Sequence, residues 1–106
     1  MAYDSSKARL HEKDHSLRHE EEFRVTARRN KLLGLWAAEL MNIRGTAAEA
    51  YAKDVVTADL QEPGDEDVFR KILGDFAHYS IPLSRENVSK KMGELLAEAR
   101  HQLKGR

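Results

Sequence analysis

Large apolar side chains are distributed very unevenly along this chain of 106 residues, and their distribution limits where a core can form. Counting Val, Ile, Leu, Met, Phe, Tyr and Trp, residues 23–106 hold 26 of them and residues 1–22 hold four. A chain of this length has room for one domain with one modest core. We therefore expect a folded domain over residues 20–106, preceded by an N-terminal arm over residues 1–19.

The stretch from Arg28 to Glu39 is the strongest helix signal and the centre of the predicted domain. Its helix starts at Glu20-Glu21-Glu22 or continues from the arm, and Gly45 is the predicted stop. Gly34 indicates close approach of a neighbouring helix, because Gly inside a helix costs about 1 kcal/mol relative to Ala. The spacing predicts a buried face made of Phe23, Ala27, Leu32, Leu33, Trp36 and Leu40.

Three further helices follow from capping signals. Thr46-Ala47-Ala48-Glu49 has the form of a capping box for the second helix, which Glu62-Pro63-Gly64 ends. Asp65-Glu66-Asp67 supplies a cap and dipole-matched charge for the third helix. Ser84 caps the fourth, with a hydrophobic staple between Leu83 and Val88.

Apolar spacing also gives each of these helices one buried face. The predicted faces are Ala48, Tyr51, Ala52, Val55, Val56 and Leu60, then Val68, Phe69, Ile72, Leu73 and Phe76, then Val88, Met92, Leu95, Leu96, Ala99 and Leu103. No segment shows the alternation of a strand. The fold class is therefore predicted to be all-α, a compact four-helix bundle with a flexible or frayed-helical N-terminal arm.

Charge and composition exclude several classes of protein. Eighteen basic residues balance eighteen acidic ones, so the chain lacks the basic excess that nucleic-acid binding requires. There is no Cys, which excludes disulfides and thiolate metal sites. No signal-peptide-like start and no apolar run of membrane-spanning length occur, so we expect a soluble intracellular protein without membrane insertion.

The arm is polar and buries too little area to fold alone, which favours a role in binding a partner. His11, His15 and His19 would share one face of a helix, and with four basic and three acidic residues the charge of residues 1–19 rises from +1 to +4 when all three are protonated. Two interpretations of these histidines are open: they act as a pH sensor, or they form a solvated face with no switching role. The candidate partner-binding residues are Ser5, Lys7, Arg9, Leu10, His11, Lys13, His15, Leu17 and Arg18.

His11-Glu12-Lys13-Asp14-His15 matches the H-E-x-x-H pattern of zinc hydrolases. Such a helix lies beside a substrate cleft, and a chain this short offers little room for one. We interpret the match as incidental and predict no metal site. With no Cys nucleophile, Gly-flanked Ser or Gly-rich phosphate loop, we also predict no catalytic residues and no enzyme activity.

Arg28, Arg29, Lys31 and Trp36 are candidate nucleotide-binding residues, because cations beside an aromatic ring suit phosphates and a base. The alternative is structural: the cations solvate the outer face of a helix and Trp36 belongs to the core. Both interpretations stay open at this point.

Four blocks of sequence together resemble the zeta-type inhibitor subunit of alphaproteobacterial F-type ATP synthases. They are Ala27 to Glu39, Ala50 to Val56, Gly64 to Lys71 and Lys91 to Leu96, and the resemblance covers roughly Phe23 to Leu103. It implies a four-helix bundle whose N-terminal segment, here residues 1–19, enters a catalytic subunit interface beside the rotor and blocks ATP hydrolysis mechanically. It further implies partners in the catalytic head and rotor, a cytoplasmic location at the membrane-bound synthase, and no required cofactor.

Two functions remain open. The first is an inhibitor subunit, monomeric when free, that stops rotor movement. The second is a small helical module that senses ADP or ATP as a weak regulatory ligand and associates with the synthase without strong inhibition.

Overall fold

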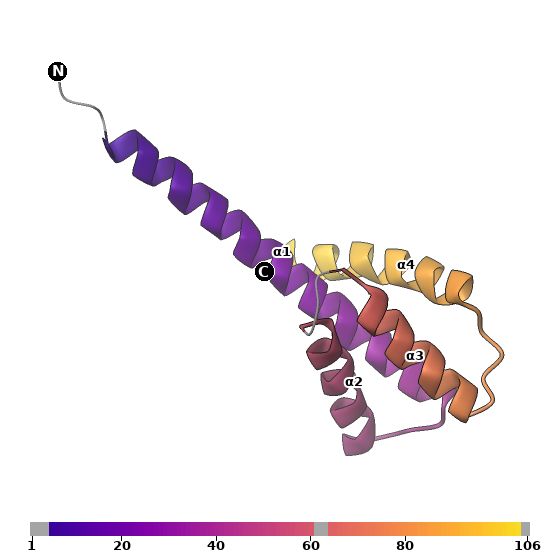
Figure 1. Ribbon diagram of the computed structural model, residues 1–106. Helices are drawn as coiled ribbons and strands as arrows, with labels where there is room; N and C mark the ends of the chain where they lie inside the picture. Colours follow the sequence, from indigo (N-terminus) through magenta and orange to yellow (C-terminus); the bar gives the residue numbers. More distant parts are fainter. Residues whose placement is uncertain (1–4, 61–63, 105–106) are drawn as a thin grey trace.

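Four α-helices make up the fold in the computed structural model, which describes residues 5–60 and 64–104 and the side chains from residue 19 onward within them. Helix α1 is Ser5–Leu40, α2 is Thr46–Asp59, α3 is Glu66–His78 and α4 is Arg85–Lys104 (Figure 1). Neither range contains a strand. The all-α, four-helix prediction is confirmed, and α1 continues through residue 19, so Glu20-Glu21-Glu22 lies inside a longer helix.

Helix α1 is the element against which the other three assemble. Its most extensive contacts are with α2 and α4, and α3 packs chiefly on α2. Figure 1 shows the N-terminal half of α1 projecting away from the other helices, while the C-terminal end of α4 reaches the middle of α1. The helical body therefore surrounds only the C-terminal half of α1.

The core contains residues from all four helices, and α3 and α4 bury the faces predicted for them. Val68, Phe69, Ile72 and Phe76 of α3 are buried, and Leu73 packs beside them. On α4, the buried residues are Val88, Met92 and Ala99. The spacing of apolar residues therefore predicted the face of α3 correctly and that of α4 in part, since Leu95, Leu96 and Leu103 are only partly buried.

The predicted buried face of α1 is wrong for most of its residues, although Leu33 is fully buried as predicted. Phe23 is 60% exposed and Leu40 is 41% exposed, while Leu32 and Trp36 are only partly buried. Helices α2 and α4 both press on α1, so its most buried line consists of small and polar residues, and large side chains lie at its edges. The buried residues of α1 are Val25, Arg29, Asn30, Leu33, Gly34, Ala37 and Ala38, and Met41 directly after the helix is also buried.

Gly34 lies where α1 and α2 approach each other most tightly, as the sequence predicted. A Cβ atom at this position would stand 2.6 Å from Ala52 Cα, 3.1 Å from Ala52 Cβ and 3.2 Å from Val55 Cγ2. The first of these contacts is to backbone, which cannot rotate away. Only glycine therefore allows α2 to lie this close to α1.

Helix α1 ends at Leu40 and the chain turns at Asn42, before the predicted stop at Gly45. Asn42 has φ 60°, and the Ile43 amide donates to the Ala38 carbonyl at 2.8 Å, as in a Schellman motif. Ser80 ends α3 in the same way, with φ 58° and a 2.8 Å bond from the Ile81 amide to the Phe76 carbonyl. Pro82 predicts a turn over residues 78–82, so the end of α3 is where the sequence indicates. The end of α1 was not foreseen, because Asn in place of Gly occupies its left-handed position.

The helix starts agree with the sequence at α4 and differ at α2. Ser84 Oγ accepts a 3.2 Å bond from the Asn87 amide, and Asn87 Oδ1 accepts a 2.9 Å bond from the Ser84 amide, a reciprocal cap. The predicted capping box at Thr46 is wrong: Gly45 is the N-cap of α2 and no side chain caps the helix. Gly45 has φ 65°, and this turn leaves Thr46 inside the helix.

Helix α2 also ends earlier than predicted, at Asp59, and Leu60 is 60% exposed although the sequence placed it in the core. The turn proposed at Glu62-Pro63-Gly64 lies mostly outside the described residues. At the start of α3, Asp65 is the N-cap residue but makes no side-chain capping bond. Its carboxylate instead binds Arg29 of α1, which ties the start of α3 to the central helix.

Candidate functional site

The arm residues predicted to bind the partner lie on the first turns of α1, where only the backbone is described. The side chains of Ser5, Lys7, Arg9, Leu10, His11, Lys13, His15, Leu17 and Arg18 fall outside the described residues, so their role stays a prediction. The H-E-x-x-H match at His11 and His15 lies there too. Among side chains that are described, no group of three or more His, Asp or Glu could hold a metal ion.

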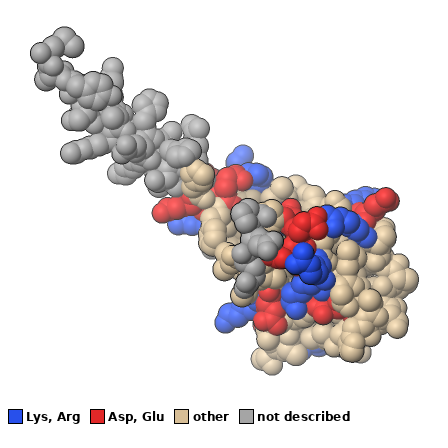
Figure 2. All heavy atoms as spheres, viewed as in Figure 1, with Lys and Arg blue, Asp and Glu red and all other residues tan. Residues whose placement is uncertain are grey.

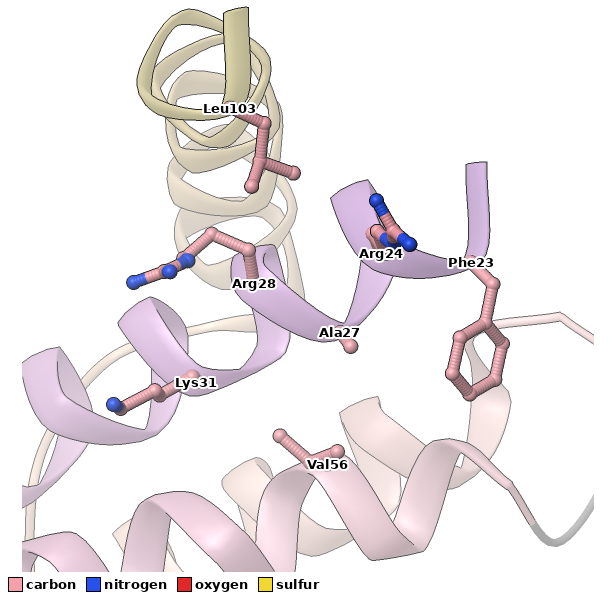
Figure 3. A pocket seen from close by; sticks show the side chains of 7 residues that line it. All are labelled: Phe23, Arg24, Ala27, Arg28, Lys31, Val56 and Leu103. Atoms are coloured by element: carbon pink, nitrogen blue, oxygen red, sulfur yellow. The ribbon is translucent and has the colours of Figure 1, made fainter. Parts of the chain in front are cut away.

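The four candidate nucleotide-binding residues are divided between different sides of α1. Arg28 and Lys31 line one open groove (Figure 3). Arg29 is 6% exposed and faces the start of α3, where its Nη2 donates to Asp65 Oδ1 at 2.8 Å. Trp36 packs edge-on against Phe76, with ring centroids 5.8 Å apart. The structure thus brings Arg28 and Lys31 together and keeps Arg29 and Trp36 apart from them.

The groove beside Arg28 and Lys31 has a volume of about 410 Å³ and is formed by α1, α2 and the end of α4. In Figure 3, Val56 of α2 points toward Ala27 of α1, the Phe23 ring lies beside them, and Leu103 reaches in from α4. The lining combines four apolar residues with three cations: Phe23, Ala27, Val56 and Leu103, and Arg24, Arg28 and Lys31.

A second hollow of about 320 Å³ shares Lys31 and Val56 with this groove, so the two adjoin along the α1–α2 interface. The second hollow adds Lys53 and Glu49 to the lining. The combined surface, which we call the α1–α2 groove, therefore carries four cations and one carboxylate. On the face of the molecule that Figure 2 shows, acidic and basic side chains lie intermixed.

Sequence reasoning missed the apolar part of this groove, because it assigned Phe23, Val56 and Leu103 to buried faces. One signal could have identified Phe23. It is the only apolar residue in the run from Arg18 to Arg24, where a helix is polar on all sides. A large ring in such a run cannot belong to a continuous buried stripe.

A polar junction joins α1 to the end of α2 and the start of α3. Asn30, which is 1% exposed, accepts bonds at its Oδ1 from Arg29 Nε at 3.0 Å and Arg29 Nη2 at 2.8 Å. Burial raises the pKa of Asp59, the last residue of α2, and the charge of Arg29 and the polar side chain of Asn30 offset this only in part. The junction holds Arg29 within the fold, away from the α1–α2 groove.

The end of α4 makes the outermost contact with α1. Arg100 donates to both carboxylate oxygens of Glu22, at 2.9 Å and 3.2 Å, and this hydrogen bonding and the charge of Arg100 lower the pKa of Glu22. Val25, one turn further on, is 3% exposed. The packed part of α1 therefore begins at about Glu22, whereas His19, Glu20 and Glu21 are exposed.

Comparison with known proteins adds three findings. The family model for the ATPase inhibitor subunit zeta matches residues 1–102. A protein whose structure was solved by NMR in solution is 45% identical, with the alignment covering 79% of this chain and 95% of that chain at a TM-score of 0.71. A search of curated proteins found no match.

In the described part of the chain, none of the helices has the length and apolar character needed to cross a membrane. The family match spans the projecting part of α1 as well as the four-helix body, and the similar solved structure supports the same fold. The chain therefore belongs to the ATPase inhibitor subunit zeta family.

Proposed function

We propose that this protein inhibits the F-type ATP synthase by inserting the N-terminal part of α1 at a catalytic subunit interface, where it blocks rotor movement and ATP hydrolysis. The observation that supports the proposal is the combination of the family match over residues 1–102 with a helix that extends beyond its own body. The site of action is then the cytoplasmic face of the membrane that carries the synthase.

The dimensions of α1 suit such a block. Residues 5–21 precede the Glu22–Arg100 contact with α4, and at 1.5 Å per residue this segment is about 25 Å long as a helix. A rod of that length reaches deep into a subunit interface. Because α1 is one helix from Ser5 to Leu40, any force on its N-terminal part passes directly into the body.

This mechanism needs no chemistry from the inhibitor. The body supplies an anchor, since α1 is fixed by α2 at Gly34 and by α4 at Glu22. The arm supplies the obstruction. The protein is then a regulatory subunit and not an enzyme, and it acts as a monomer, which light scattering on the free protein would check.

The direct test is to add the protein to purified ATPase of an alphaproteobacterium and follow steady-state ATP hydrolysis. Hydrolysis should fall with increasing inhibitor and level off at a stoichiometric complex. Unchanged hydrolysis together with no co-purification of the two proteins would refute the proposal.

The nucleotide-sensing alternative keeps one supporting observation, namely that Arg28 and Lys31 line the same groove. In this second candidate function, ADP or ATP occupies the groove as a weak regulatory ligand and the module binds the synthase without strong inhibition. Titrating ADP into isotopically labelled protein would test it, with amide shifts expected at Arg28 and Lys31. Absence of shifts at millimolar ADP would exclude the candidate.

A further inference from the structure

We propose that the α1–α2 groove is a second contact with the ATPase and that it receives an acidic amphipathic helix of that enzyme. The inference rests on the proposed function and adds a docking surface on the body of the protein. Its occupant is identified by the charge, the apolar content and the shape of the groove.

The charge of the groove favours an acidic occupant. Its lining carries Arg24, Arg28, Lys31 and Lys53 against the single carboxylate of Glu49, although the whole chain has equal numbers of acidic and basic residues. Such a local excess attracts carboxylates. The arm of the same chain has four basic and three acidic residues and so is not the complementary partner.

The apolar content favours an amphipathic occupant. The Phe23 side chain is 60% exposed, an unusual position for a phenylalanine that lies next to Val56 and Ala27 in the groove. Covering such a ring with an apolar partner face would stabilise the complex through the hydrophobic effect. The cations around it would pair with acidic residues that flank the apolar face of the partner.

The shape of the groove favours a helix. Phe23, Ala27 and Lys31 are successive i, i+4 positions along α1, so they form one row that follows the helix axis. Ala27 in the middle of the row is small and leaves space between Phe23 and Lys31. A ridge of side chains on a helix of the partner fits between this row and α2 in the way that helices ordinarily pack.

A phosphate ligand suits the same lining poorly. Phosphates in proteins are usually held by backbone amides at helix N-termini. Here Phe23 to Lys31 lie within α1, while Val56 and Leu103 lie in the last turns of α2 and α4. Helix C-termini carry partial negative charge and oppose a phosphate.

The position of the groove explains how it would assist inhibition. It begins at Phe23, directly after Glu22, where α1 leaves the body. A partner helix in the groove would therefore lie beside the base of the arm while the arm is inserted. Two linked contacts raise the affinity of the complex beyond that of either one, so the groove would slow dissociation without itself blocking the rotor.

The first test compares Phe23→Ala and Arg28→Glu with matched controls in the full-length protein on purified ATPase. Each groove variant should raise the concentration for half-inhibition about tenfold, the effect of losing about 1.4 kcal/mol of binding. Full inhibition should still be reached at saturation. Leu40→Ala and Lys90→Glu alter an exposed leucine and an exposed lysine outside the groove, and they should stay within about twofold of wild type.

The second test places a photoreactive phenylalanine derivative at position 23 and identifies the cross-linked peptide in the complex. A cross-link to an acidic amphipathic helix of an ATPase subunit would support the inference. A cross-link to a second copy of this chain would overturn the inference. A cross-link that disappears when ADP is added would overturn it as well.

The two proposals fail in different ways. If wild type neither binds nor inhibits the ATPase, the proposed function fails. If wild type inhibits and both groove variants inhibit equally well at every concentration, only the docking surface fails.

Discussion

Gly34 and Asp59 show how single residues fix the position of α2 against α1. The first allows the two backbones to approach, and the second ends α2 beside the polar junction of Arg29 and Asn30. Neither residue is large or apolar. Both matter because α1 lies between α2 and α4, so the most buried positions are those with the least space.

Replacing Gly34 by Ala should destabilise the fold. The added methyl group would meet the Ala52 backbone at 2.6 Å, so α2 must move away from α1. Such overpacking costs about 1–3 kcal/mol, more than the gain of about 1 kcal/mol in helix propensity. Urea unfolding followed by circular dichroism would measure the net loss.

The matched control is Gly93→Ala in α4, where a Cβ atom would meet no heavy atom within 4 Å. That substitution should stabilise the protein by up to about 1 kcal/mol through propensity alone. Equal effects of the two substitutions would show that the close contact between α1 and α2 is absent in solution.

Asp59 should make stability depend on pH. A carboxyl group whose pKa is raised by folding binds its proton more tightly in the folded state, so stability falls as the pH rises through the raised pKa. This loss of stability is absent below the ordinary aspartate pKa of about 3.9, where the carboxyl group is protonated in both the folded and the unfolded state. Asp59→Asn should therefore raise the melting temperature at neutral pH, and the gain should disappear in acid.

Asp54→Asn is the control for that change, since Asp54 is exposed on the same helix. It removes an equal charge without removing a partly buried carboxylate. A gain for Asp59→Asn that is independent of pH, or one that Asp54→Asn matches, would contradict the assigned role of burial.

At the scale of secondary-structure elements, the helix starts offer a direct comparison of sequence and structure. Ser84 and Thr46 both precede a residue that could complete a capping box, and only Ser84 makes the bonds. The difference arises at Gly45, whose φ of 65° lets it take the N-cap position and moves Thr46 into the helix. A side chain inside the first turn cannot cap it in the same way.

Ser84→Ala should cost about 1 kcal/mol of stability, because the Asn87 amide loses its acceptor. Thr46→Ala should change stability by less than about 0.5 kcal/mol, because the threonine is exposed and makes no capping bond. Chemical unfolding of the two variants side by side would measure both. A larger loss for Thr46→Ala would show that Thr46 caps α2 in solution, as the sequence predicted.

Amphipathic spacing predicted α3 and α4 well, because each of these helices has one buried side. Val68, Ile72, Phe76, Val88 and Met92 all lie in the core. The same reasoning failed for most of α1, which contacts all three other helices and has no single apolar stripe. The turn at Asn42 that follows α1 was also missed, since a non-glycine residue in the left-handed region leaves little trace in a sequence.

The candidate site was predictable only in part for the same reason. Arg28 and Lys31 were identified as exposed cations, and they do lie together. Arg29 is adjacent to Arg28 in the sequence and yet is 6% exposed, because one residue along a helix turns a side chain by about 100°. Phe23 was assigned to the core from its spacing, although in the fold it lies in the open groove and is 60% exposed.

At the scale of the whole molecule, α1 serves two parts of the protein. Its C-terminal half is the central element of the body, and its N-terminal half extends beyond the contact between Glu22 and Arg100 (Figure 1). The large apolar residues follow the same division, with 26 in residues 23–106 and four before them. A body that holds nearly all of these residues should fold without the arm.

Removing residues 1–19 should therefore leave the fold of residues 20–106 unchanged and abolish inhibition of the ATPase. The Glu22–Arg100 pair and the whole core remain in the shortened chain, so its melting temperature should stay within a few degrees of the full-length value.

A chain whose first 19 residues are replaced by a Gly/Ser segment of equal length keeps the bulk of the arm without its helix or side chains, and it should also fail to inhibit. Circular dichroism melting and the rate of ATP hydrolysis would measure the two properties separately. Loss of the fold on truncation would show that the arm is part of the domain, and inhibition that survives truncation would move the block from the arm to the body.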